Sequence, residues 1–487
     1  MTTETANDTG QPPTRKQVRA SIDDADVAFR TCWETLASLK KVKVDGPALL
    51  DFQPTLASAL FRLDDIYRQL VHHSGVLVSK KASFSPETFR RRMRALDQDL
   101  KGLRTAICVG RNLGDAFVWI FYQYDQPSLE LHFRNPPNPH TPPGIGGRGE
   151  LEFIRQFRLP GFLILYHGIT TFLRIGDVSF FNPATGRISA IGELETTLLK
   201  PGELMVSMHS IHREKIPFAN ANARPVQREI PNGRHSQPPT AGSQTKKKQF
   251  EATLERQTKK MAEALRRTEP SRKADLRSAY QTDDVAMFAN QLSARGLGFQ
   301  QIGKGGVLVG CCPYRGRSLS SRIYSKVSEA SVLKRFARLR GQVATICDPS
   351  STDNSIFYSE LDPGVCRGIA PLFWFPCDID FLEKTYFKRA VVGTIYNPVH
   401  LLRALQARGY EVRVGYPKDG TPRFEIRKPI SEAVAGIEGF DSYLRLIQHR
   451  FMREEKIIHA LDTVVMQSLE LTAGRPGRID LNFAHFF

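Results

Sequence analysis

Residues 149–197 read GELEFIRQFRLPGFLILYHGITTFLRIGDVSFFNPATGRISAIGELETT, and this stretch carries the clearest information on the fold. It opens after a glycine-rich segment and has apolar residues at helical spacing, namely Leu151, Ile154 and Phe157. This spacing predicts a short amphipathic helix, which Pro160-Gly161 ends.

Three runs of strand length follow this helix, at residues 162–167, 172–181 and 188–197. Between the last two runs, residues 182–186 (NPATG) have a composition typical of a turn. The last two strands are therefore expected to form an antiparallel hairpin. The predicted order of elements is helix, strand, strand, strand.

Acidic residues gather on the predicted hairpin. Asp177 lies on its first strand, and Glu193 and Glu195 lie two residues apart on its second strand. Residues two apart on a strand point to the same face, so both glutamates are expected to project together near Asp177. Carboxylates gathered in this way repel one another unless a cation lies between them, and oxygen-only clusters suit Mg²⁺ or Mn²⁺. The alternative is that these acids lie on an ordinary solvated face.

This layout resembles the PD-(D/E)XK nuclease superfamily. Asp177 matches the Asp of that motif, and Glu193 matches its second acid. Glu150 or Glu152 matches the further acid that many members carry on the first helix. The resemblance implies a restriction-endonuclease-like αβββ core in which Asp177, Glu193 and the helix acid bind Mg²⁺ or Mn²⁺.

One position departs from the motif, because Glu195 stands where the family has Lys. In the resembled site, Glu195 would act as a metal ligand or as a general base for the attacking water. The resemblance also implies a helix after the third strand, and residues 202–216 would form it. Lys200 or Lys215 could supply the missing cation, although both are equally ordinary surface lysines.

The composition favours a nucleic-acid partner. The 487 residues carry a formal net charge of +18, and DNA is expected in preference to RNA. The chain has no apolar run of about eighteen residues, which predicts no membrane insertion. Its start lacks the pattern of a signal peptide, so we expect a cytoplasmic protein. A protein partner or a homo-oligomer is left open.

The length predicts a multidomain protein of mixed α+β and α/β character. The expected parts are a disordered tail over 1–16, a helical region packing on the core over 17–135, the nuclease-like core over 136–220, a basic flexible linker that can contain a helix over 221–277, and a C-terminal mixed α/β domain over 278–487. From Arg224 to Arg277 there are fourteen Lys/Arg and six Asp/Glu, a net charge of +8 (14 − 6). Such a segment can hold a nucleic-acid backbone, and it is equally a plain spacer.

Local signals place further elements in the outer parts of the chain. Helical spacing predicts helices over 18–39 and 55–72, and Ser85-Pro86 marks the start of a third helix. Residues 292–296 and 405–409 each end a predicted helix with glycine and precede a β-rich stretch. A hairpin is therefore expected after each of these two helices.

The leading hypothesis is a metal-dependent nuclease that acts on DNA phosphodiester bonds, with Asp177, Glu193 and Glu195 as its catalytic residues. The alternative is a catalytically inactive, nuclease-like protein that binds nucleic acid or serves as a scaffold. A third hypothesis is a subunit whose basic surfaces recruit a partner protein.

Overall fold

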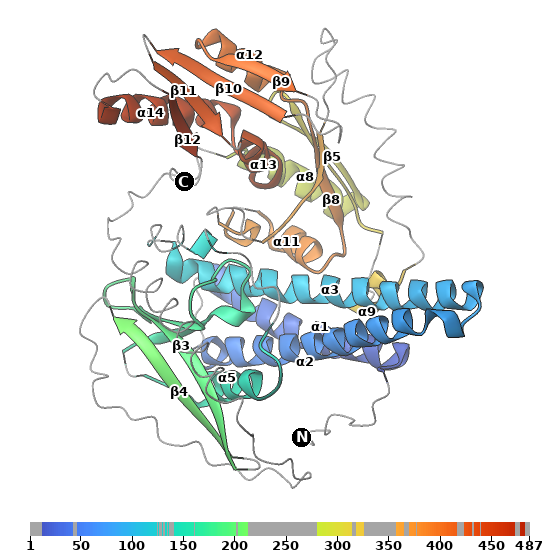
Figure 1. Cartoon of the computed structure of the whole chain (residues 1–487). Helices are drawn as coiled ribbons and strands as arrows, with labels where there is room; N and C mark the ends of the chain where they lie inside the picture. Colours follow the sequence, from blue (N-terminus) through green and yellow to red (C-terminus); the bar gives the residue numbers. More distant parts are fainter. Residues whose placement is uncertain are drawn as a thin grey trace. The chain divides into compact units, whose positions relative to one another are not determined.

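The computed structural model shows a mixed α+β protein with two compact units (Figure 1). The structure describes residues 12–41, 46–123, 125, 129, 132–133, 135, 141–159, 161–200, 203–212, 280–313, 318–325, 357–364, 370–375, 377–415, 423–430, 433–438, 440–472 and 478–482. The first unit comprises Met1–Glu269 together with Arg317–Ser325, and the second comprises Pro270–Gly316 and Lys326–Phe487. The predicted linker over 221–277 lies outside the described residues.

Three long helices form a bundle at the start of the first unit (Figure 1). They are α1 (Arg15–Lys40), α2 (Gly46–Ser79) and α3 (Pro86–Tyr122). The predicted start of α3 is confirmed, because the Ser85 hydroxyl accepts the Thr88 N–H at 3.3 Å and Pro86 occupies the first helical position. Phe52 of α2 stacks on Phe117 of α3 with ring centroids 4.0 Å apart. The predicted helical region is therefore a packed bundle.

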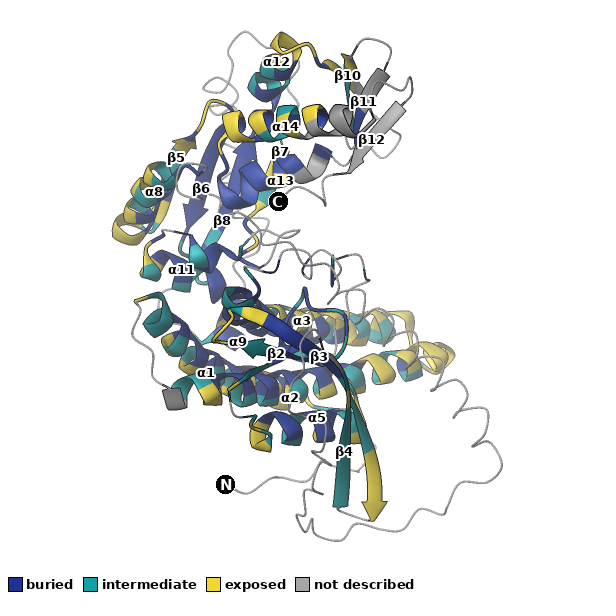
Figure 2. Ribbon diagram, turned by 90° about the vertical axis from the view of Figure 1, so that its left-hand side faces the viewer, coloured by how far each residue is buried: buried dark blue, intermediate teal, exposed yellow. Residues whose placement is uncertain are grey.

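A four-stranded antiparallel sheet with the order β1-β2-β3-β4 follows the bundle. The preceding helix and the strands are α5 (Gly144–Gln156), β1 (Leu163–Tyr166), β2 (Val178–Asn182), β3 (Arg187–Lys200) and β4 (Glu203–His212). The predicted order of helix and three strands is confirmed, and β2 and β3 form the expected hairpin. Residues 188–192 of β3 are buried, whereas residues 197–200 at its far end are exposed (Figure 2).

The glycine-rich segment before residue 149 is helical and forms the first turns of α5. Close packing explains why glycine is needed there. A Cβ atom on Gly147 would lie 2.5 Å from the ring of Phe61, and one on Gly149 would lie 2.0 Å from the hydroxyl of Thr196. The glycines thus let α5 approach both α2 and β3, which outweighs their poor helix propensity.

The expectation of a helix over 202–216 is wrong for the described part of that range, which is strand β4. A local strand pattern accompanies this, since residues 206–209 (VSMH) alternate between apolar and polar side chains. These residues pair across the ladder with β3, for example Met208 with Leu194. Residues 213–216 lie outside the described part of the chain.

A short helix from the second half of the sequence belongs to the first unit. This helix, α9 (Leu319–Ile323), packs on α1 and α3. Leu319 is fully buried, and its backbone N–H donates to Asp26 Oδ2 at 3.2 Å. The buried Arg322 guanidinium lies 3.6 Å from Asp26 Oδ1. The sequence assigned this segment to the C-terminal part, and neither its length nor its composition predicts this packing.

The second unit contains two four-stranded sheets, with the orders β5-β6-β8-β7 and β12-β11-β10-β9. Its elements are α8 (Thr282–Arg295), β5 (Leu297–Ile302), β6 (Gly306–Cys311), β7 (Phe357–Glu360), α11 (Ile379–Tyr386), β8 (Val391–Tyr396), α12 (Val399–Ala407), β9 (Glu411–Gly415), β10 (Arg423–Ile430), β11 (Ala433–Glu438), α13 (Phe440–Arg450), α14 (Glu454–Thr472) and β12 (Arg478–Asn482). Both predicted hairpins are confirmed as β5–β6 and β9–β10. Gly296, with φ +70°, ends α8 as expected. No helix in the described part of the chain combines the length and apolar character needed to cross a membrane.

Candidate active site

Backbone contacts at the start of β2 fix Asp177 beside β3. Its N–H donates to the Gly192 carbonyl at 2.8 Å, and its carbonyl accepts the His167 N–H at 2.8 Å. The carboxylate Oδ2 accepts the backbone N–H of Leu194 at 2.7 Å. Gly176, with φ +69°, provides the left-handed turn that leads into Asp177. Asp177 is therefore held against the β3 residues on both sides of Glu193, by its backbone at Gly192 and by its side chain at Leu194.

Helix α5 contributes a third acid, Glu150, which is buried. Its Oε2 accepts a short hydrogen bond of 2.5 Å from the hydroxyl of Tyr166, the last residue of β1. Electrostatic interactions connect Glu150 to both Asp177 and Glu193. The structure thus brings together one acid from the helix, one from the start of β2 and one from β3.

Burial places this cluster in an environment that disfavours negative charge. Burial, together with the charge of Asp177, raises the pKa of Glu193 to about 8. Burial, followed by the charges of Asp177 and Glu193, raises the pKa of Glu150 to about 8. Burial also raises the pKa of Asp177 to about 6, although the hydrogen bond from the Leu194 backbone acts in the opposite direction. Among the described residues, buried Glu193 Oε2 has no hydrogen-bond partner.

Two other predicted site residues lie apart from this cluster. Glu152 Oε1 accepts a hydrogen bond from Gln156, and its Oε2 lies 3.9 Å from Arg155, so its contacts are with its own helix. Glu195 has 38% of its side chain exposed, and its Oε2 lies 3.7 Å from Nε2 of His209 on β4. Of the two helix acids left open by the sequence, the structure brings Glu150 to Asp177 and Glu193.

The cluster offers only oxygen ligands, which suit Mg²⁺ or Mn²⁺. No three His, Cys, Asp or Glu side chains in the described part of the chain are arranged to hold one metal ion. At most two of the described carboxylates therefore reach a common ion in this arrangement. That number is typical of magnesium sites, in which one or two carboxylates bind the ion and water and substrate phosphates complete its shell.

A buried polar chain supports the turn that presents Asp177. His167 Nδ1 lies 3.0 Å from the Gly176 carbonyl, so this nitrogen carries the proton, and Nε2 accepts from the Ser179 hydroxyl at 2.6 Å. The Ser179 hydroxyl in turn lies 2.6 Å from the hydroxyl of Tyr122 on α3. Burial lowers the pKa of His167 to about 4, which keeps the imidazole neutral. The sequence gives no signal for this network, because its members are spread over distant segments.

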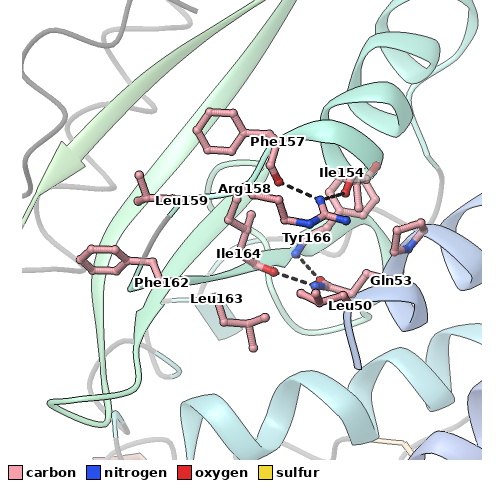
Figure 3. Close-up of a pocket in the computed structure, with 11 residues that line it drawn as sticks. Leu50, Gln53, Ile154, Phe157, Arg158, Leu159, Phe162, Leu163, Ile164 and Tyr166 are labelled. Atoms are coloured by element: carbon pink, nitrogen blue, oxygen red, sulfur yellow. Dashed lines mark hydrogen bonds between the residues drawn. The ribbon is translucent and has the colours of Figure 1, made fainter. Parts of the chain in front are cut away.

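A cavity of about 330 Å³ is lined in part by Tyr166 (Figure 3). Its lining is mainly apolar and contains none of the clustered acids. On its wall, the side chain of Gln53 donates to the Ile164 carbonyl at 2.6 Å and accepts the Tyr166 N–H at 2.7 Å. This amide bonds the outer edge of β1 as a neighbouring strand would. The cavity is therefore separate from the acidic cluster.

Comparison of the chain with protein-family models, curated proteins and solved structures finds no match. The resemblance to the PD-(D/E)XK nucleases therefore stays a prediction from the sequence.

Proposed function

We propose that this protein is a metal-dependent nuclease that cleaves DNA phosphodiester bonds. The observation that carries the proposal is the cluster of Glu150, Asp177 and Glu193, in which burial raises all three pKa values and the charges of neighbouring acids raise those of Glu150 and Glu193 further. Structural acids are normally compensated by donors or cations, whereas Glu193 Oε2 is buried with no partner among the described residues. An oxygen site that lacks compensation fits a divalent cation.

The three clustered acids and Tyr166 would have different roles in this site. Asp177 and Glu193 would bind Mg²⁺ or Mn²⁺, and Glu150 would add negative charge from α5 while Tyr166 fixes its orientation. The bound ion would lower the pKa of water and neutralise charge on the scissile phosphate. The net charge of +18 would attract the DNA backbone.

Cleavage assays test this proposal directly. Wild-type protein should cut duplex DNA in the presence of Mg²⁺ or Mn²⁺, and Asp177→Ala and Glu193→Ala should each abolish cleavage while DNA binding is retained. Asp24→Ala is a matched control, because Asp24 is an exposed acid of the same unit. Glu195→Ala measures the contribution of the residue that departs from the motif, and Glu195→Lys should show some activity because it restores the usual lysine. A wild-type protein that cuts nothing and whose melting temperature does not respond to metal would refute the enzyme.

A catalytically inactive DNA-binding or scaffold protein is the second candidate. Glu195 at the lysine position favours it, and so does β4 in place of the expected helix. This candidate predicts DNA binding without cleavage and no effect of Asp177→Ala on either property. The metal-dependent change in melting temperature separates the two candidates even if the DNA substrate is poorly chosen.

A further inference from the structure

Strand β4 brings a histidine beside the acidic cluster. His209 pairs directly with Glu193 in the antiparallel ladder between β3 and β4. Directly opposed residues place their side chains on the same face with Cβ atoms roughly 4.5–5.5 Å apart. Glu195, two residues after Glu193, projects to that face as well. His209 therefore shares a face with both glutamates of β3.

The contact between His209 and Glu195 lies at the open end of this face. Nε2 of His209 is 3.7 Å from Glu195 Oε2, and the two side chains are 49% and 38% exposed. Glu193, by contrast, has an oxygen that is fully buried. A ligand that approaches Glu193 along this face would thus come close to the more exposed imidazole of His209.

A phosphodiester substrate needs a hydrogen-bond donor beside Glu193. The substrate is an anion, and carboxylates alone would repel it. The cationic residues at the two ends of β3 are far away, since Lys200 lies seven residues from Glu193 and Arg187 six residues, or roughly 23 Å and 20 Å at 3.3 Å per residue. His209 lies on the neighbouring strand at the same level as Glu193. An imidazole N–H donates readily to a phosphate oxygen.

We propose that His209 binds a phosphate oxygen of the DNA substrate at the scissile position and that Glu195 holds its imidazole in place. This inference rests on the proposed nuclease function and names a residue that no sequence motif indicates. Glu195 then acts as a positioning residue for His209. This role explains why Glu stands at the position where the motif has Lys. The donor comes from β4, the strand that replaces the expected helix.

The test compares steady-state cleavage of one duplex DNA with Mg²⁺ by wild type, His209→Ala, His209→Lys, Glu195→Gln and Thr197→Ala. Loss of the donor should lower kcat about 100-fold, as removal of one donor to a developing anion typically does. The affinity for the same duplex without divalent metal and the melting temperature should stay unchanged. His209→Lys should recover most of the lost activity, because it restores a phosphate donor at the same position.

Two further measurements test the role of Glu195. Glu195→Gln should lower kcat on the order of 10-fold, as loss of a contact that orients a functional group does. Glu195→Gln combined with His209→Ala should be no slower than His209→Ala alone, because the carboxylate acts through the imidazole. Thr197, exposed and two residues further along the same face, provides the control, and Thr197→Ala should cleave like wild type.

The outcomes separate this inference from the proposed function. If wild type cuts nothing and its melting temperature does not respond to metal, the nuclease proposal fails and the role of His209 fails with it. If wild type cleaves and His209→Ala cleaves equally well, only the role of His209 is overturned. A His209→Lys variant as slow as His209→Ala would also overturn it, since a donor at that position would then have no effect. Additive losses in the double variant would overturn the positioning role of Glu195.

Discussion

Replacing Asp177 by Asn should stabilise the metal-free protein at alkaline pH and not at acidic pH. Burial raises the pKa of Asp177 from the ordinary value of about 3.9 to about 6. At about 1.4 kcal/mol per pKa unit, keeping this carboxylate ionised costs about 3 kcal/mol. The stability of wild type should fall as the pH rises, because the folded protein binds this proton more tightly than the unfolded chain does. The stabilising contribution of the proton is complete below about pH 4 and is lost as the pH rises through about 6.

Asn keeps an oxygen that can accept the Leu194 N–H and carries no charge at any pH. Its amide group adds an offset of about 1 kcal/mol that does not depend on pH. The variant and wild type should therefore differ in free energy of unfolding by different amounts at about pH 4 and at about pH 8. The predicted quantity is the change in this difference between the two pH values. That change is about 3 kcal/mol, or roughly 6–12 °C in melting temperature for a unit of this size.

Thermal unfolding in EDTA at these two pH values provides the measurement. Asp24→Asn is the matched control, because Asp24 is 65% exposed and its ion pair with Arg62 at 3.0 Å contributes little. If Asp177→Asn shifts the melting temperature equally at both pH values, burial does not penalise the Asp177 carboxylate. The electrostatic account of the cluster would then be wrong.

Three further predictions concern other parts of the molecule. Gln53→Leu should lower the free energy of unfolding in chemical denaturation by roughly 2–5 kcal/mol, because it leaves two backbone groups of β1 unpaired, and an unchanged free energy would contradict this. Limited proteolysis should cut first between residues 224 and 248. The two fragments should nevertheless co-elute in gel filtration, because Arg317–Ser325 of the second fragment packs within the first unit. Fragments that elute separately would contradict this. DNA affinity should fall steeply with salt in titrations, and a flat dependence would exclude backbone contacts as its source.

The fold of the central stretch could be predicted because its signals are local. The turn at 182–186 and the cap at Ser85 each depend on a few neighbouring residues, and both are confirmed. Strand β4 also carries a local signal, since residues 206–209 (VSMH) alternate between apolar and polar side chains. There the expectation drawn from the resembled family took precedence over the local pattern and was wrong.

The contacts that complete the site could not be predicted in this way. Gln53 and Tyr166 are 113 residues apart, and nothing in the composition around Gln53 indicates that its amide bonds a strand edge. Glu150 and Glu152 point to different sides of α5, because two residues span about 200° of helical rotation. Only the packing of the helix decides which of them reaches Asp177.

The side chain of Gln53 makes the two edges of the β1-β2-β3-β4 sheet different, because it covers one of them. Its amide occupies the backbone groups of β1 at Ile164 and Tyr166, so a foreign strand cannot add there without displacing it. At the opposite edge of the sheet, no described strand pairs with the outer side of β4. Any extension of this sheet by a peptide or by a second molecule is thereby directed to β4, the strand that carries His209.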